Sequence, residues 1–221
     1  MGTLLVEGKT LFPRTRNKAM PPDQSLMIDR ILSLAAESGI ATSLAILEVE
    51  SAPAPGAESD ITELHQILRK LAGLLRERMP NELLFDRWGP AGFLCLHPNS
   101  SLTETANILA KLGDLLHKHL ESRISHRSPN LFIGLAGFPE HGSSRIEILR
   151  RAEEALYVAR QAGKDTIQLP PTEVLHKVTV PMSTIQIERL NSLAAHEGVN
   201  APDLIREAVD DLLRRTYENG P

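Results

Sequence analysis

The 221-residue sequence predicts an α/β domain with a mixed sheet, followed by a small strand-helix-helix domain. Helical and strand-like apolar patterns alternate between residues 23 and 169, as they do in α/β domains. The proline-led segment PPTEVLH, at 170–176, then interrupts this pattern and reads as a linker. Polar and apolar residues alternate at 177–182, and two short helical patterns follow. The chain is long enough for one full core and one appended module.

The N-terminal domain is predicted element by element from its apolar spacing. Residues 1–22 carry four basic side chains against one acidic and show no periodicity, so we expect a basic arm or cap. The expected elements of the domain over 23–169 are a helix over 23–38 ended by Gly39, a strand over 43–49, a loop at 51–59, a helix over 61–79, a hairpin of strands 83–88 and 93–96, a helix over 102–124, a strand over 131–138, a helix over 146–163 and a closing strand over 165–169. Because the strands of a hairpin pair antiparallel, the sheet is expected to be mixed.

Composition and charge exclude several classes of protein. The chain has 24 Lys and Arg against 28 Asp and Glu, a net charge of −4, which excludes a strongly basic nucleic-acid coat but not a local basic patch. Its single cysteine, Cys95, excludes an internal disulfide and a cysteine-based zinc site, and suits a reducing cytoplasm. No run of 18 apolar residues and no signal-peptide pattern occurs. We therefore expect a cytoplasmic protein with no membrane span and no cofactor.

Residues 10–169 resemble the GGDEF domain, the fold of diguanylate cyclases. FIGLAGFPEHG at 132–142 and LRRAEEALYVARQAGKDTIQL at 149–169 are similar to the C-terminal stretch of that family. DRWGPAGFLCLHP, at 86–98, is similar to the family's hairpin motif. The resemblance implies a mixed sheet flanked by helices, in agreement with the pattern of elements.

Most catalytic residues that the resemblance implies are missing from this sequence. Where the family has Gly-Gly-Asp/Glu-Glu-Phe, the chain has GPAGF at 89–93, so Ala91 and Gly92 replace the two acids and Pro90 replaces the second glycine. One metal-binding carboxylate survives at Glu48. Phosphoryl transfer relies on divalent metal to neutralise developing charge. A single carboxylate therefore predicts a catalytically inactive domain without a metal site.

A guanine nucleotide, GTP or cyclic di-GMP, is the ligand that the resemblance implies. Arg160 and Lys164 match the basic residues that contact the triphosphate in the family. Alternatively, these two cations only end a helix, where positive charge is favourable. The family's inhibitory product site, Arg-x-x-Asp, is replaced here at Pro80 and Leu83. Whether the domain binds a nucleotide stays open. The preferred interpretation is that the two cations only end a helix.

The C-terminal domain, expected over 177–216, resembles a ribbon-helix-helix module of the Arc/CopG class. The match covers KVTVPMSTIQIERLNSLAAHEGVNAPDLIREAVDDLLRR at 177–215. Alternation places Val178, Val180 and Met182 on one face of a strand, Gly198 is expected to end the first helix, and Asn200 is expected to cap the second. A module of this size rarely builds a sufficient core alone, so we expect a homodimer with paired strands.

The same resemblance implies contacts with the major groove of double-stranded DNA. The six implied positions are Lys177, Thr179 and Pro181 on the strand, and Asn200, Ala201 and Pro202 at the start of the second helix, where backbone amides hold a phosphate. A lysine can donate to guanine, whereas proline has neither an N–H nor a polar side chain. Residues 176–221 carry a net charge of −2, which opposes phosphate binding.

Taken together, the two resemblances predict a dimeric DNA-binding transcriptional regulator. Its GGDEF-like domain would act as a sensor, for a guanine nucleotide, or as an interaction module. The alternative is a non-DNA scaffold that uses both domains for contacts with protein partners. Cys95 is interpreted as a core thiol and His97, in His-Pro-Asn, as a loop histidine.

Overall fold

The computed structural model describes residues 5–6, 9–10, 24–50, 61–120, 129–163, 165–172 and 176–218. The chain divides into two compact units, Met1–Pro170 and Pro171–Pro221. Most of the expected basic arm, the expected loop at 51–59 and residues 173–175 of the expected linker lie outside the described residues. Within the arm, β1 (Leu5–Val6) and β2 (Lys9–Thr10) pair antiparallel. None of the described helices is long and apolar enough to cross a bilayer.

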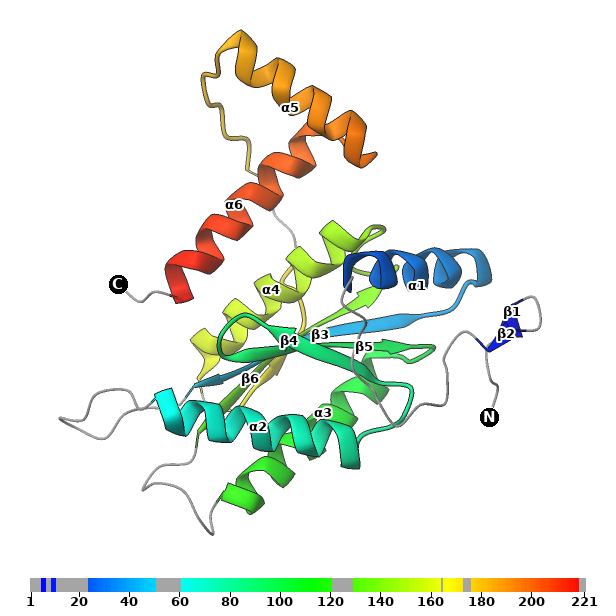
Figure 1. The fold of residues 1–221 in the computed structure, drawn as a ribbon, viewed down its shortest axis with the longest axis vertical. Helices are drawn as coiled ribbons and strands as arrows, with labels where there is room; N and C mark the ends of the chain where they lie inside the picture. Colours follow the sequence, from blue (N-terminus) through cyan, green and yellow to red (C-terminus); the bar gives the residue numbers. More distant parts are fainter. Residues whose placement is uncertain are drawn as a thin grey trace, which may run out of the picture. The chain divides into compact units, whose positions relative to one another are not determined.

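The first unit is built on a five-stranded sheet with the order β4-β5-β3-β6-β7 (Figure 1). Its strands are β3 (Thr42–Glu50), β4 (Leu84–Trp88), β5 (Gly92–Pro98), β6 (Asn130–Phe138) and β7 (Ile167–Gln168). The three pairs that join β4, β5, β3 and β6 are antiparallel, and β6 pairs parallel with β7. The expected mixed sheet is therefore confirmed. The closing strand has two residues instead of the expected five.

Two layers of helices cover the sheet. The helices of this unit are α1 (Gln24–Ser38), α2 (Ile61–Arg78), α3 (Leu102–Leu120) and α4 (Arg145–Ala162). On one face, α2 and α3 bury a core with Ala45 and Leu47 of β3, and on the other, α1 and α4 bury a core with Leu44 and Ile46 (Figure 1). Because both faces are covered, β3 is apolar on both sides rather than alternating.

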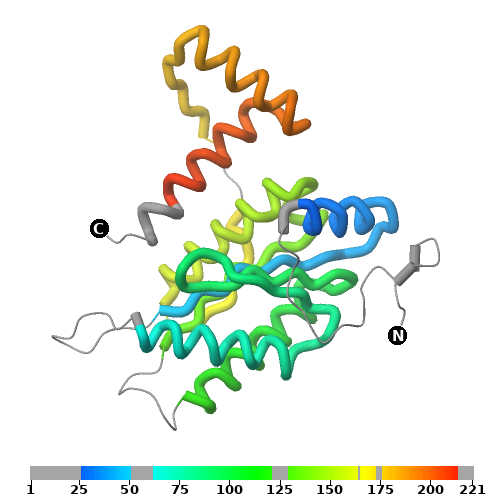
Figure 2. The backbone as a smooth tube through the Cα atoms, in the orientation of Figure 1, coloured from blue at the N-terminus to red at the C-terminus, as the bar shows by residue number. Residues whose placement is uncertain are grey.

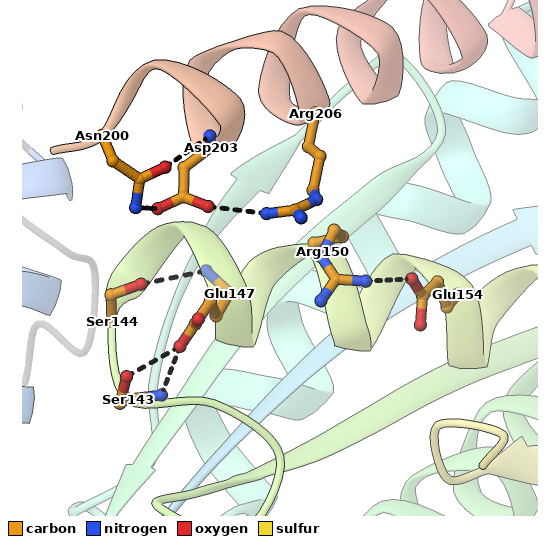
Figure 3. Close-up of polar contacts among 8 residues, drawn as sticks. All are labelled: Ser143, Ser144, Glu147, Arg150, Glu154, Asn200, Asp203 and Arg206. Carbon is orange, nitrogen blue, oxygen red and sulfur yellow. Dashed lines mark hydrogen bonds and ion pairs between the residues drawn. The ribbon is translucent and has the colours of Figure 1, made fainter. Parts of the chain in front are cut away.

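The backbones of β6 and α4 are in direct contact at Gly134. A Cβ atom built there would lie 2.1 Å from the carbonyl oxygen of Ala152 and 2.3 Å from the amide nitrogen of Leu156. At the start of α4, the Ser144 hydroxyl caps the helix by accepting from the Glu147 N–H (Figure 3). Gly134 thus fixes how closely α4 approaches the sheet, and so positions the side chains of its last turn.

The start of α4 also holds an anionic side chain in place. The backbone N–H and the hydroxyl of Ser143 both donate to the Glu147 carboxylate, at 2.7 Å and 2.8 Å (Figure 3). These hydrogen bonds lower the pKa of Glu147 because they favour its charged form. A carboxylate in the first turn also interacts favourably with the helix dipole.

The second unit contains two helices, α5 (Thr184–Glu197) and α6 (Ala201–Glu218). Ser183 and Gln186 form a capping box at the start of α5, and Gly198, with a φ of 69°, ends it as expected. Residues 176–182 form no regular secondary structure, whereas a strand is expected over 177–182. A strand requires a neighbouring backbone for its hydrogen bonds, and the described part of this single chain supplies none to that segment.

Candidate functional site

The β4–β5 hairpin lies along β3 (Figure 2), and its turn is next to the end of that strand. Its turn begins at Gly89, whose φ of 60° is readily adopted by glycine. The guanidinium of Arg87 donates to the carbonyl oxygens of Gly89 and Pro90, at 3.3 Å and 2.5 Å. The Val49 N–H donates to the Ala91 carbonyl at 3.0 Å. These contacts fix Ala91, at the position where the resemblance places an acid, against β3.

Gly92 occupies a position that has no room for a side chain. It pairs with Glu48 across the β3–β5 ladder. A Cβ atom at Gly92 would lie 2.2 Å from the carbonyl oxygen of Leu47 and 3.1 Å from that of Trp88. The hairpin therefore packs too closely on β3 to carry a carboxylate at the position where the resemblance places one.

The carboxylate of Glu48 is bound by Arg160, from the last turn of α4. The Arg160 Nε donates to Glu48 Oε1 at 2.9 Å, and the Nη2 group donates to Oε2. Both side chains are 28% exposed. The structure thus brings Glu48, where the resemblance places a metal-binding carboxylate, together with Arg160, one of the two candidate nucleotide contacts. The other candidate, Lys164, lies outside the described residues.

The residues at this site do not fit a divalent metal ion. Magnesium prefers six oxygen ligands in near-octahedral geometry. Here Glu48 is already neutralised by a cation of the chain, and the neighbouring Glu50 accepts from the Asn130 amide at 3.2 Å. Within the described ranges, no group of three or more His, Cys, Asp or Glu side chains is placed to hold a metal.

The sheet order, the two helix layers and the hairpin beside β3 define an α/β domain of the GGDEF type. Residues 64–166 match the model of the family described as diguanylate cyclase, GGDEF domain. This segment is therefore similar to a GGDEF domain in sequence and in fold, which agrees with the resemblance of residues 10–169. No curated protein matches the chain.

Solved structures share this fold at low sequence identity. The GGDEF domain of YfiN (TpbB) from Pseudomonas aeruginosa is 20% identical, with a TM-score of 0.53, over 67% of this chain and 94% of that one. The active GGEEF domain of a diguanylate cyclase from Vibrio cholerae is 13% identical, with a TM-score of 0.57, over 67% and 95%. The GGDEF domain of DgcB from Caulobacter crescentus, solved in complex with c-di-GMP, is 16% identical, with a TM-score of 0.52, over 76% and 97%.

The segment 177–182 is the second candidate site. Its polar residues Lys177 and Thr179, and Pro181, are exposed. The apolar residues between them are exposed as well, with Val178 at 80% and Val180 at 67%. In the single chain, both sets of side chains therefore face solvent.

The start of α6 is stabilised by side chains of the chain itself (Figure 3). The Asn200 Oδ1 accepts from the Asp203 N–H at 3.0 Å, which confirms the expected cap. The Asp203 carboxylate accepts from the Asn200 side-chain amide and from Arg206 Nη1, the latter at 2.7 Å. Ala201 is half-buried, and Pro202 supplies no N–H. Because Asp203 brings negative charge to this helix end, the arrangement opposes binding of a DNA phosphate here.

A buried polar cluster was missed by the sequence analysis. His97 lies within β5, not in a loop as expected, and its Nδ1 is 3.0 Å from Thr105 Oγ1. The Ser100 hydroxyl lies 3.1 Å from the same oxygen and donates to Glu104 at 3.0 Å. Burial lowers the pKa of His97, so the neutral imidazole is favoured. The cluster joins the end of β5 to the first turn of α3. The polar residues 99–101, between β5 and α3, were the feature of the sequence that could have indicated this cluster.

Proposed function

We propose that the chain is a dimeric DNA-binding regulator whose GGDEF domain is an interaction module rather than a cyclase. The observation that carries this proposal is the alternation in the exposed segment 177–182. One set of its side chains is apolar and suited to burial, and the other includes a lysine and a threonine suited to DNA. Within the part of the chain that the structure describes, the side chains of Val178 and Val180 stay exposed.

The apolar surface of the second unit supports pairing with a second copy. Among the described residues of this unit, only Ala194 is buried. The exposed large apolar residues are Val178, Val180, Met182, Ile185, Ile187, Leu193, Ile205, Val209, Leu212 and Leu213. Large apolar side chains exposed in this number are typical of an interaction site. Antiparallel pairing of two copies of 177–182 would satisfy the backbone groups and cover the apolar residues.

Pairing of the strands would leave Lys177, Thr179 and Pro181 on the outer face of the ribbon. Lysine and threonine have the hydrogen-bonding groups needed to read base edges in the major groove. The weak point is the phosphate clamp at Asn200 to Pro202, because Asp203 already places an anion there. The Asp203 carboxylate and the net charge of −2 on residues 176–221 favour the alternative function, a scaffold that binds proteins through both units.

Replacement of Lys177 by alanine tests DNA binding. The side chain is exposed, so the unfolding free energy is expected to change by less than about 0.5 kcal/mol. Loss of a base contact is expected to weaken binding of duplex DNA by roughly 1–3 kcal/mol. If the lysine contacts phosphate instead, the slope of log K against log salt shrinks by about 0.9 per contact, or nearly two in a dimer.

The matched control is Lys70→Ala on α2, which removes the same charge from an exposed position of the GGDEF domain. DNA affinity equal in the two variants would place the DNA surface elsewhere, or show that none exists.

We further propose that the GGDEF domain does not make cyclic di-GMP. Ala91 carries no carboxylate, Gly92 has no room for one, and Glu48 is bound by Arg160. Incubation of the full chain with GTP and Mg²⁺ or Mn²⁺ is therefore expected to yield no cyclic dinucleotide by chromatography. Product that increases in proportion to protein concentration, and that is lost in Glu48→Gln, would contradict this.

An interaction role is preferred to a nucleotide-sensing role for the same domain. The relative from Caulobacter crescentus was solved with c-di-GMP. In this chain the Arg-x-x-Asp positions are Pro80 and Leu83, and Leu83 is fully buried. Arg160 already bonds to Glu48. The positions considered for guanine-nucleotide binding therefore present few groups suited to a phosphate.

A further inference from the structure

The ion pair between Glu48 and Arg160 joins two elements that are 112 residues apart in the chain. Glu48 lies near the end of β3, and Arg160 lies in the last turn of α4. Two nitrogens of one guanidinium donate to the two oxygens of one carboxylate. Bidentate, charge-assisted pairs of this kind are among the strongest polar contacts in proteins. Partial burial of both side chains reduces screening by water and salt.

The surroundings of the pair leave Arg160 as the cation that the structure places on the Glu48 carboxylate. On the β5 side, Gly92 is the Cα partner of Glu48 and has no room for a second carboxylate. The carbonyl oxygen of the adjacent Ala91 accepts from the Val49 N–H. A lone, partly buried carboxylate is unfavourable unless it is paired. The guanidinium of Arg160 supplies that pairing from within the chain.

We propose that the Glu48–Arg160 pair is an internal substitute for a bound metal ion and phosphate. The guanidinium takes the place of a divalent cation on the carboxylate, and the carboxylate takes the place of an anionic phosphate on the guanidinium. One contact thereby closes this end of β3 to both kinds of ion. It also fixes the last turn of α4 to the sheet without any ligand.

The first test compares Glu48→Ala with Glu50→Ala in the full chain. Each variant removes one negative charge from the end of β3, but only the former removes the carboxylate that Arg160 binds. With inorganic pyrophosphate as the probe and no divalent metal, isothermal calorimetry is expected to show at least tenfold tighter binding to Glu48→Ala than to the unmodified chain or to Glu50→Ala. The double variant Glu48→Ala with Arg160→Ala is expected to lose that gain. Equal pyrophosphate affinity in the unmodified chain and in Glu48→Ala would overturn the proposal.

The second test measures thermal unfolding with Mn²⁺ alone. The midpoint of the unmodified chain is expected not to change with Mn²⁺ concentration. Saturable stabilisation by Mn²⁺ that is lost in Glu48→Ala and kept in Glu50→Ala would show that the carboxylate binds metal despite Arg160, and would overturn the proposal. Neither test involves DNA, so their outcome is separate from that of the Lys177→Ala experiment.

Discussion

Replacement of Gly134 by alanine is expected to destabilise the GGDEF domain by about 3 kcal/mol, near the upper end of the usual cost of overpacking. The added Cβ would lie 2.1 Å from the Ala152 carbonyl oxygen and 2.3 Å from the Leu156 nitrogen, both of which are backbone atoms of α4. A side chain can rotate away from such a contact, but here β6 or the whole of α4 must move. For a domain of this size, the expected fall in the unfolding midpoint is about 6–12 °C.

The matched control for this change is Gly73→Ala, also a glycine-to-alanine substitution in the first unit. Gly73 lies inside α2, and a Cβ atom there would contact nothing within 4 Å. Alanine is the better helix former, so this variant is expected to be more stable by roughly 0.5–1 kcal/mol. Denaturant unfolding of the two variants beside the unmodified chain measures both effects. A Gly134→Ala variant as stable as Gly73→Ala would contradict the close β6–α4 contact.

Replacement of Val180 by aspartate is expected to convert the proposed dimer to a monomer. Val180 is 67% exposed in the single chain, so the substitution leaves the monomer fold unchanged. In the paired ribbon it would bury two carboxylates without partners, at roughly 2 kcal/mol or more for each copy. The dimer dissociation constant is then expected to rise about a thousandfold.

Light scattering or sedimentation over a concentration series measures this change, with Thr179→Asp as the control. That variant introduces the same charge at the adjacent position, which in the proposed ribbon would point away from the dimer core. It is therefore expected to stay dimeric while its affinity for DNA falls. Dimers of equal strength in both variants would place the dimer interface outside the segment 177–182.

The fold of the GGDEF domain was largely predictable because its signals are local. Apolar spacing located α2 and α4 to within one residue at each end, and the glycine-bounded turn located the β4–β5 hairpin. Gly198 and Asn200 marked the end of α5 and the start of α6 for the same reason. Capping and turn formation depend on a few adjacent residues, so the sequence contains what is needed to find them.

The candidate site was less predictable because it depends on contacts between distant residues. The sequence indicated Glu48 and Arg160 separately, but their pairing follows from the approach of α4 to β3, which no local pattern reports. The crowding at Gly92 likewise arises from the register of β3 with β5. The alternation at 177–182 predicts a strand, but the described residues of the single chain supply no backbone to pair with this segment, and it forms no regular secondary structure. Pairing with a second copy stays part of the proposal.

DNA binding by a dimer is tested most directly by titrating double-stranded DNA with the full chain at several salt concentrations. The oligomeric state of the chain is recorded at each concentration. A dimeric DNA-binding regulator is expected to bind saturably, with log K falling linearly as log salt rises, because lysine contacts with phosphates release counterions. A dimer that binds no duplex DNA even at the lowest salt concentration would contradict the DNA-binding function and leave the scaffold as the function of both units.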